Sequence, residues 1–478
     1  MLFSKSAIGP LVAAWVAVAA PPSKPVKKDV IVIGGGSSGA HAAVRLRDDY
    51  GLSVALIEKQ DILGGHVNSY TDPETGEFYN YGVQTFVETG NATGFVSRFG
   101  IETMAPPRLA LNTEYIDFKT AKPLEYVGPT SAEQRAALEI YLALCEKYEH
   151  MLNPGYWEFP TPGNIPEELL INFGDFAKRH GMEAAVPIIW RVGAMGVGDA
   201  TKIMTFYVMQ TFGAPLTRNF LGLATSWVPS TGRSQDLYDA IDAHLGKDVY
   251  RSSTVIDAKR KKCGVHATVK NHKTGKTTEI QARALVIAIE PTASNMKPFH
   301  LDEQESAVFN KFEYTNIWAG ILANEALPVG GSLTNMDPKV ELPKPNNWLA
   351  YPDLPFSVRF DYMGGEKLFR IMIQGDSGMT DAGARAMIQA DFERLIDAGI
   401  LPEPKSRKIE YVAWESHGPM HARVSRPEIE RGFIQDQYAL LGRHSTWYTG
   451  GAFSMNFQTS LWEYNDVMLP KLVASLEK

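Results

Sequence analysis

The stretch that decides the fold is Asp29-Val-Ile-Val-Ile33 followed by Gly34-Gly35-Gly36-Ser37-Ser38-Gly39. Its first half is a continuous apolar run of β-branched residues, which is typical of a buried parallel strand. Its second half has the G-x-G-x-x-G spacing of a turn that binds a dinucleotide. A strand that runs directly into this turn gives the motif more weight than the glycines alone would carry.

Each glycine of the motif has its own task in such a turn. Gly34 permits the tight bend, Gly36 lets the backbone approach a pyrophosphate, and Gly39 lets the next helix pack closely on the strand. We expect that helix to run from residue 37 to about residue 50. The N–H groups of its first turn, that of Ser38 among them, would point at the phosphates.

A second strand and an acidic residue complete the expected nucleotide site. Residues 53–57 form another apolar run, and it ends in Glu58, 24 residues after Gly34. This is near the spacing at which a carboxylate accepts a hydrogen bond from a ribose hydroxyl. The alternative is a glycine-rich turn in an unrelated α/β unit, which would not require the strand, turn, helix, strand and acid in this order.

Composition bounds the rest of the chain. It has 478 residues, of which 44% are hydrophobic, and this length predicts two or three globular domains. The formal net charge of −7 offers no basic field for a nucleic-acid backbone, so nucleic acid is not an expected partner. With only Cys145 and Cys263, the chain cannot build an iron–sulfur cluster or a cysteine-based zinc site, and no metal is expected.

A second glycine pair follows Glu58 and Lys59 and indicates which dinucleotide is bound. Here the sequence resembles the flavin-dependent amine oxidase superfamily, whose members carry an acid, a spacer and a Gly-Gly-Arg element beside FAD. Gly64, Gly65 and His66 stand at that element, with His66 in place of the usual arginine. The imidazole can still donate to oxygen atoms, but the bidentate hold of a guanidinium is lost. The resemblance implies FAD as the cofactor.

Further segments extend this resemblance in the same order along the chain. Gly82, Val83 and Gln84 resemble the stretch that passes the reactive edge of the flavin ring, and Val255 resembles the valine that brackets the adenine. The run from Tyr448 to Phe453, with Gly450 and Gly451, resembles the C-terminal turn that presents a helix N-terminus to the flavin. We expect that helix to begin near Asn456, where its positive dipole end would stabilise an anionic reduced flavin.

The resemblance implies an α/β fold with a discontinuous Rossmann-type FAD-binding domain and a mixed α+β substrate-binding domain. The FAD-binding domain is expected at 27–105, 226–295 and 430–478, and the substrate-binding domain at 106–225 and 296–429. In the first insertion we expect a helix that begins with a capping box at Ser131 and Gln134 and another over 166–181. The second insertion is expected to hold strands at 357–362, 367–374 and 408–414 and a helix at 381–398.

The N-terminus is typical of a secretory signal peptide. An uncharged run from residue 7 to residue 20 follows Lys5 and is too short to span a bilayer, and a small-x-small pattern precedes a proline-rich break. We therefore expect residues 1–19 to be cleaved and the mature protein to be extracellular; a disordered tail or a weak anchor is the alternative. Asn91 is the expected glycosylation site. Cys145 falls on the apolar stripe of a helix and Cys263 in a strand-like segment, so we do not expect them to pair.

The resemblance also implies a reaction, in which a hydride leaves a C–H bond of a bulky, largely apolar small molecule. Amine oxidases of the superfamily place a lysine on the strand that enters the substrate domain, but residues 312–318 contain none. This departure favours a dehydrogenase, similar to the secreted fungal β-cyclopiazonate dehydrogenase group, or a fatty-acid double-bond isomerase over an amine oxidase. A non-catalytic FAD-binding protein is the remaining alternative. The C-terminal turn lacks the cysteine that links FAD covalently in some members, so non-covalent FAD is expected.

Two residues are candidates for a direct role in the reaction. Tyr448 could form an aromatic wall over the flavin, or pack under the C-terminal helix, and Gln84 could hydrogen-bond the flavin edge, or simply belong to a turn. His417 is a weaker candidate for a general base. It lies four residues from His421, but Gly418-Pro419 forbids the helix that would align the two as metal ligands, so a loop is expected there. The protease-like tetrapeptide Gly375-Asp-Ser-Gly378 has no matching His and Asp and is interpreted as a polar turn.

Overall fold

The computed structural model describes residues 24–107, 109–343, 346–365 and 367–477. The expected signal peptide, residues 1–19, therefore lies outside the described residues. Among the helices in these ranges, none is both long enough and apolar enough to cross a membrane.

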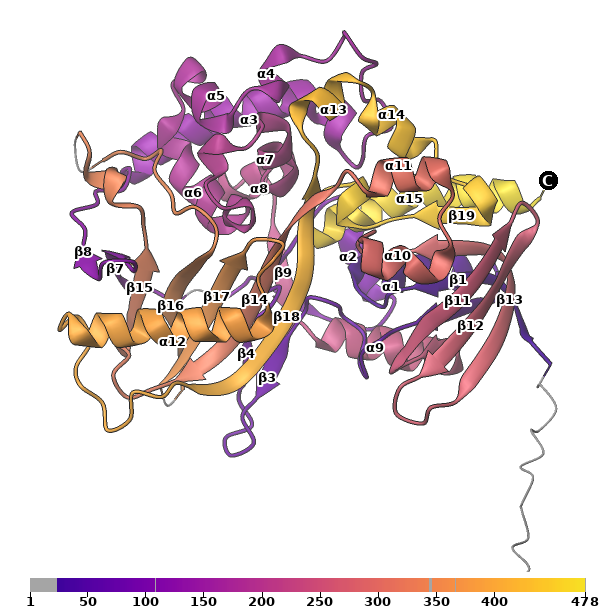
Figure 1. The fold of residues 1–478 in the computed structure, drawn as a ribbon, viewed down its shortest axis with the longest axis horizontal. Coiled ribbons are helices and arrows are strands. Elements are labelled where there is room, and N and C mark those ends of the chain that lie inside the picture. The colour runs from indigo at the N-terminus through magenta and orange to yellow at the C-terminus, as the bar shows by residue number, and fades with distance from the viewer. Residues whose placement is uncertain (1–23, 108, 344–345, 366, 478) are drawn as a thin grey trace, which may run out of the picture.

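Two seven-stranded sheets lie side by side, and the helices pack around them (Figure 1). In spatial order the first sheet consists of β10 (Val249–Tyr250), β2 (Val54–Ile57), β1 (Val26–Ile33), β13 (Thr277–Ile287), β12 (Gly264–Asn271) and β11 (Ser253–Lys261), with β19 (Thr446–Tyr448) also paired to β13. Strands β10, β2, β1, β13 and β19 are parallel, whereas β12 and β11 extend the sheet in an antiparallel ribbon.

The centre of the first sheet is as apolar as the sequence predicts. Residues 30–33 of β1 pair with residues 54–57 of β2 on one side and with residues 284–287 of β13 on the other. Most of these side chains are completely buried, because helices cover both faces of a parallel sheet. The helices nearest to this sheet are α1 (Ser37–Asp48), α2 (Ala92–Ser97), α9 (Asp236–Leu245), α10 (Ala293–Met296), α11 (Glu303–Phe309) and α15 (Gln458–Leu476).

The second sheet is largely antiparallel and is backed by one long helix. Its order is β18 (Glu410–Arg423), β14 (Glu313–Ala323), β17 (Leu368–Gly375), β16 (Phe356–Gly364), β15 (Gly331–Asn335), β7 (Asn112–Asp117) and β8 (Lys122–Pro123). Helix α12 (Asp381–Asp397) lies across one face of it (Figure 1), and its buried side chains share a core with those of β17. Short pairings of β3 (Ser69–Thr71) with β4 (Phe78–Asn80), and of β5 (Phe86–Val87) and β6 (Thr103–Met104) with β9 (Ser226–Pro229), complete the strands.

A group of helices lies at one end of the second sheet, above it in the view of Figure 1. They are α3 (Ser131–Leu152), α4 (Glu167–Leu170), α5 (Phe173–His180), α6 (Val186–Val192), α7 (Thr205–Thr211) and α8 (Ala214–Phe220), and α13 (Arg426–Glu430) and α14 (Phe433–Tyr438) lie beside them. The molecule thus has the predicted α/β class, with a Rossmann-type part and a mixed α+β part. Every strand of the first sheet comes from 27–105, 226–295 or 430–478 except for the first residue of β1, and every strand of the second from 106–225 or 296–429.

Some local predictions were wrong. The capping box of α3 uses Thr130 and Glu133, one position before the predicted pair, and the helix predicted over 166–181 is divided into α4 and α5. Residues 417–421 form part of β18 rather than a loop. A proline fits there because β18 is the edge strand of its sheet. Helix α11 lies beyond the predicted boundary at 296, yet it packs against the first sheet.

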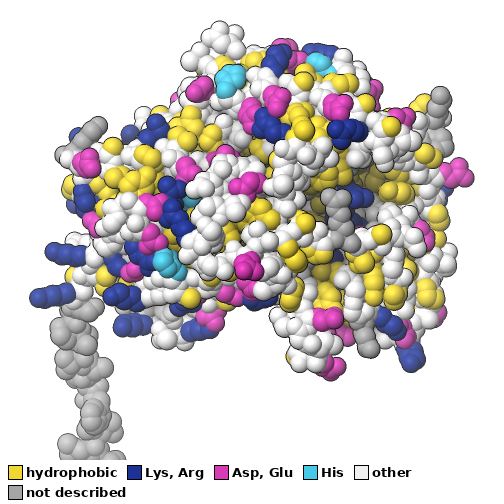
Figure 2. All heavy atoms as spheres, turned by 180° about the vertical axis from the view of Figure 1, so that it is seen from behind, with side chains coloured by type: hydrophobic (Ala, Val, Ile, Leu, Met, Phe, Trp, Pro, Cys, Tyr) yellow, Lys and Arg dark blue, Asp and Glu magenta, His cyan; other side chains and the backbone are white. Residues whose placement is uncertain are grey.

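The described surface carries charges of both signs, and the two cysteines do not pair. Figure 2 shows positive and negative side chains interspersed over the face turned away from the viewer in Figure 1. Cys145 is buried in α3, where burial raises the pKa of its thiol, and Cys263 is exposed in the turn between β11 and β12; both are free thiols.

Candidate functional site

The glycine-rich turn after β1 has the close packing that its motif predicts. Gly34 has a φ of +98°, and a Cβ at Gly39 would lie 1.9 Å from the carbonyl oxygen of Gly34, so helix α1 could not start here with a larger residue. By contrast, a Cβ at Gly36 would make only an ordinary contact, 3.5 Å from the Cα of Gly65. Gly34 and Gly39 thus shape the turn, whereas Gly36 is free to meet a ligand.

The second glycine pair lies directly against the first. Gly65 has a φ of +59°, and a Cβ there would lie 2.9 Å from the Cα of Gly36; Gly64 donates its N–H to the carbonyl oxygen of Gly35 over 2.9 Å. Two segments that are 30 residues apart in sequence therefore form one surface of bare backbone. Such a surface is suited to the close approach of a pyrophosphate at the N-terminus of α1.

Glu58 lies at the end of β2 beside this backbone surface. It is 5% exposed, and its Oε2 accepts a hydrogen bond from the Gly35 N–H at 2.6 Å while its Oε1 accepts one from the Gln60 N–H at 2.7 Å. Burial raises the pKa of the carboxyl, and the two backbone N–H groups act in the opposite direction. Neighbouring Lys59 is exposed, and its positive charge lowers the pKa of both Glu58 and His66.

The predicted flavin-edge segment runs along the backbone after the second glycine pair. A Cβ at Gly82 would lie 2.2 Å from the carbonyl oxygen of His66, and the N–H of Val83 donates to that same oxygen over 3.0 Å. The side-chain amide of Gln84 donates to the carbonyl oxygen of Asn80 over 3.0 Å. This contact within its own turn corresponds to the alternative role that the sequence allowed for Gln84.

Three histidines form a group here: His66, which follows the second glycine pair, and His417 and His421 of β18. The rings of His66 and His417 stack with centroids 4.7 Å apart, and His417 Nε2 lies 2.7 Å from Asn68 Oδ1. His421 Nδ1 lies 3.2 Å from Asn456 Nδ2. Burial lowers the pKa of His66 to about 4 and that of His421 to about 3, and it lowers the pKa of His417 as well. All three imidazoles are therefore neutral at pH 7.

The C-terminal turn meets the end of β13. Gly450 has a φ of +114° with open space around its Cβ position, and a Cβ at Gly451 would lie 2.1 Å from Asn456 Oδ1 and 3.1 Å from Glu290 Oε1. Glu290 follows β13 at the carboxyl edge of the parallel strands. Burial raises the pKa of its carboxyl to about 8. Sequence reasoning noted this residue only as the end of a strand.

Helix α15 begins where α1 begins, two residues later than predicted. The hydroxyl of Ser37 in α1 donates to the carbonyl oxygen of Gln458 over 3.3 Å, and the side chain of Asn465 donates to the carbonyl oxygen of buried Ser38 over 2.7 Å. Two helix N-termini thus converge on one place. Both concentrate positive potential where a negatively charged cofactor would lie.

Buried polar atoms without a protein partner test whether this place fits a dinucleotide. Among the described residues these atoms include Gln235 Oε1 beside Gly64, Glu290 Oε2 beside Gly451, and Gln458 Nε2 with Thr459 Oγ1 in the first turn of α15. Native proteins rarely leave such atoms unpaired. These unpaired atoms adjoin Gly64 and Gly451 or belong to the first turn of α15. A large polar ligand that extends from Gly64-Gly65 to Gly450-Gly451 therefore fits the residues present.

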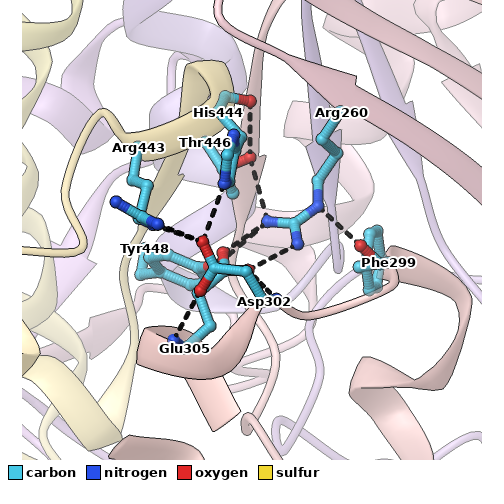
Figure 3. Close-up of polar contacts among 8 residues, drawn as sticks. All are labelled: Arg260, Phe299, Asp302, Glu305, Arg443, His444, Thr446 and Tyr448. Atoms are coloured by element: carbon cyan, nitrogen blue, oxygen red, sulfur yellow. Dashed lines mark hydrogen bonds and ion pairs between the residues drawn. The ribbon is translucent and has the colours of Figure 1, made fainter. Parts of the chain in front are cut away.

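Tyr448 and Phe453 lie behind this surface. The ring of Tyr448 is 1% exposed and stacks on Phe453 with centroids 5.3 Å apart, and its hydroxyl donates to Glu305 Oε1 over 2.8 Å (Figure 3). A ring with both its face and its hydroxyl engaged in the core corresponds to the packing alternative rather than to a wall over a ligand. The side chain of Val255 in β11 is 6% exposed; the contact predicted with the adenine involves its backbone and stays a prediction.

The polar contacts around Tyr448 and Glu305 include the described residues whose side-chain atoms come close enough together to hold a metal ion. They are Asp302, Glu305 and His444. Asp302 already pairs with Arg443 and His444, and Glu305 pairs with Arg260 (Figure 3). The arginines supply the positive charge that a metal would supply, so this cluster is an ion-pair network.

Comparison with known proteins agrees with this geometry. The model of an NAD(P)-binding Rossmann-like domain matches residues 32–99. The FAD-dependent oxidoreductase pigF of Monascus ruber is 30% identical over 461 residues, covering 95% of this chain and 94% of that protein. A β-cyclopiazonate dehydrogenase of Aspergillus flavus is 29% identical over 450 residues, covering 94% of each.

Solved structures share the fold over nearly the whole chain. The CLA-producing fatty acid isomerase from P. acnes has a TM-score of 0.69 at 16% identity and covers 93% of this chain and 98% of its own. Putrescine oxidase bound to putrescine has a TM-score of 0.60 at 16% identity, with coverage of 94% and 100%. The predicted resemblance to amine oxidases is thus confirmed at the level of the fold. The chain belongs to the family of FAD-dependent oxidoreductases that includes pigF and β-cyclopiazonate dehydrogenase, as an enzyme whose cofactor is FAD.

Proposed function

We propose that this enzyme removes a hydride from a C–H bond of a bulky, largely apolar organic molecule, as a dehydrogenase similar to β-cyclopiazonate dehydrogenase. The observation that carries the proposal is the neutral histidine group of His66, His417 and His421 between the second glycine pair and the C-terminal turn. Their lowered pKa values leave them uncharged at pH 7. An uncharged, dehydrated wall suits a C–H bond of an apolar molecule better than it suits an ammonium group.

We propose which residues hold FAD. The backbone of Gly36 and Gly65 would face the pyrophosphate, Glu58 would accept from the ribose, and the first turn of α15 would direct its N–H groups at the flavin. When bound, FAD supplies the hydride acceptor for the reaction. The turn from Tyr448 to Phe453 contains no cysteine, so we propose that FAD is held without a covalent bond.

The chain's own contribution to the reaction is positioning and exclusion of water. Asn456 lies 3.2 Å from His421 and Asn68 lies 2.7 Å from His417, so both imidazoles are held in fixed orientations. A neutral imidazole held in this way has one ring nitrogen that accepts and one that donates. His417, and not a lysine, is the candidate to receive a substrate proton, since β14 contains no lysine.

Anaerobic titration of the purified yellow protein tests the proposal. A panel of indole-derived metabolites, amines and polyunsaturated acids is added while flavin absorption is recorded. Bleaching by the indole-derived compounds alone is the expected result. Bleaching by amines alone would overturn it in favour of an amine oxidase, and conversion of an unsaturated acid without net use of an electron acceptor would overturn it in favour of an isomerase.

We also propose that the protein is secreted after removal of residues 1–19 and carries a glycan at Asn91. The Asn91 side chain is exposed at the start of α2, which supports access by a glycosyltransferase. Treatment of the secreted protein with an endoglycosidase should lower its apparent mass, and an Asn91→Gln variant should show no such shift. Retention of the wild-type protein inside the producing cell would contradict the proposal.

A further inference from the structure

A cleft of about 490 Å³ lies at the C-terminal end of β18. It is bounded by the loop between α4 and α5, by α7, and by the ends of β14 and β18. Apolar side chains line much of it, namely Leu170, Ile171, Ile203, Met204 and Val424. This volume lies within the range of small-molecule sites.

One cation in the cleft has no ion-pair partner among the described residues. Arg423 is largely buried, and its Nη1 donates to Thr315 Oγ1 over 3.0 Å and to the carbonyl oxygen of His421 over 3.3 Å. Neither acceptor is an anion. Burial lowers the pKa of this guanidinium, which shows that its surroundings compensate the charge incompletely.

The other charged groups of the cleft are accounted for. Arg426 pairs with Glu167 and Glu430, and Lys202 pairs with Asp199 and Asp353. Glu313 is the register partner of Arg423 on β14 and opposes the effect of burial on its pKa, but no oxygen of Glu313 comes within 4.0 Å of the guanidinium. Asp175, at the rim, forms no ion pair with Arg423 either.

The cleft is connected to the histidine group through β18. His421 has a φ of +55° and lies in a β-bulge between Met420 and Arg423, where Arg423 Nη1 donates to the carbonyl oxygen of His421 over 3.3 Å. His421 in turn contacts Asn456, which adjoins Gly451 of the C-terminal turn. A ligand of moderate length could therefore reach from Arg423 to the flavin side.

We propose that this cleft binds the acidic end of the substrate, a carboxylate or an equally acidic group on an apolar body, and that Arg423 is the residue that binds it. The inference rests on the proposed function for the identity of the ligand as substrate. An apolar cleft with a single unpaired guanidinium recognises this combination, because the anion completes the ion pair while the apolar part displaces water from the walls.

Binding of octanoate and of 1-octanol to the oxidised holoenzyme tests the proposal without any turnover. The two probes have the same chain length and differ in the charged group. Isothermal titration should show that octanoate binds at least about tenfold more tightly than octanol, since a hydrogen bond to a charged group is stronger than one to a neutral group. Arg423→Gln should abolish this preference and leave octanol binding unchanged. Arg426→Gln, at the rim of the same cleft, is the matched control and should keep the preference.

A second variant decides the matter if Arg423→Gln does not fold. Glu313→Gln removes a nearby negative charge that acts on Arg423 without pairing with it, so octanoate should bind severalfold more tightly while octanol binding does not change. Equal binding of the two probes to the wild-type enzyme, a preference that survives in Arg423→Gln, or an unchanged octanoate affinity in Glu313→Gln would each overturn the proposal. Failure of any C–H substrate to bleach the flavin, with octanoate binding as expected, would instead overturn the proposed function alone.

Discussion

Arg260 and Glu305 form a bidentate ion pair that is almost completely shielded from solvent, with Nη1 to Oε1 at 2.6 Å and Nη2 to Oε2 at 2.8 Å. Their side chains are 2% and 0% exposed. The pair joins β11 to α11, and the hydroxyl of Tyr448 from β19 adds a third contact to the same carboxylate (Figure 3). Three segments from distant parts of the chain are thereby held behind the cofactor surface.

Breaking this pair on one side should destabilise the protein strongly. Arg260→Met leaves the Glu305 carboxylate buried without its partner, and we expect a loss of about 3–5 kcal/mol in the free energy of unfolding. Urea denaturation followed by tryptophan fluorescence measures it. The double variant Arg260→Met/Glu305→Leu removes both charges and should recover much of the loss. A double variant as unstable as the single one would show that the ion pair itself, rather than the stranded charge, matters.

Two alanine substitutions in the glycine turn should have different effects. In Gly36→Ala the new Cβ makes only an ordinary contact, so the apoprotein should keep its stability while FAD binds about tenfold more weakly or worse, because the methyl group occupies the place of a close phosphate contact. In Gly39→Ala the Cβ would lie 1.9 Å from a carbonyl oxygen, so the apoprotein itself should be destabilised. Thermal unfolding of the apoproteins and FAD titration separate these outcomes. Equal FAD affinity in Gly36→Ala and wild type would contradict the assigned place of the pyrophosphate.

Glu58→Ala should weaken FAD binding by roughly 10- to 100-fold, which is the effect of losing a hydrogen bond to a charged acceptor. Quenching of flavin fluorescence in an equilibrium titration gives the dissociation constant. Glu58→Gln is the control, since it keeps an acceptor for the Gly35 N–H and removes only the charge. Unchanged affinity in Glu58→Ala would exclude the ribose role.

Glu290 should make the apoprotein less stable as the pH rises. Its pKa is raised by burial from about 4.5 in the unfolded chain to about 8 in the folded chain, so the folded state binds the extra proton between these values. Its contribution to stability is complete below pH 4.5, falls as the pH rises, and is lost above about pH 8. Glu290→Gln should flatten this slope and unfold at a higher temperature than wild type at pH 8. Parallel pH profiles for the two proteins would show that another group is responsible.

Local sequence was sufficient to predict those parts of the site that a single continuous segment forms. The strand before Gly34, the turn, helix α1, β2 and Glu58 all lie within about 30 consecutive residues, and all were predicted. The C-terminal helix was predicted to within two residues because a glycine pair precedes it. In α3 both Thr130 and Ser131 begin a possible capping box, and the structure uses the pair that ends in Glu133. A charged carboxylate accepts more strongly than the amide of Gln134 would.

Contacts between distant segments could not be predicted. Glu290 has its raised pKa because Gly451, more than 150 residues later, brings the C-terminal turn against it. Arg260 and Tyr448 meet Glu305 only after the two parts of the chain pack together. The strand predicted at 408–414 continues through His417 in the structure. This continuation was not predicted because Gly418 and Pro419 favour a loop locally, whereas β18 pairs with β14 on one side only and so tolerates the missing N–H of the proline. Tertiary packing overrides local preference at each of these positions.

Strand β18 has a consequence for how selectivity can change in this family. It carries His417, His421 and Arg423 within seven residues, while the backbone that faces the cofactor belongs to other segments. Under the proposed function, exchanging side chains along this edge strand should therefore alter substrate recognition, while the glycine-rich backbone proposed to hold FAD keeps its residues. Because the two tasks belong to different segments, residues 417–423 are a short stretch in which substitutions, natural or from directed libraries, can change substrate selectivity.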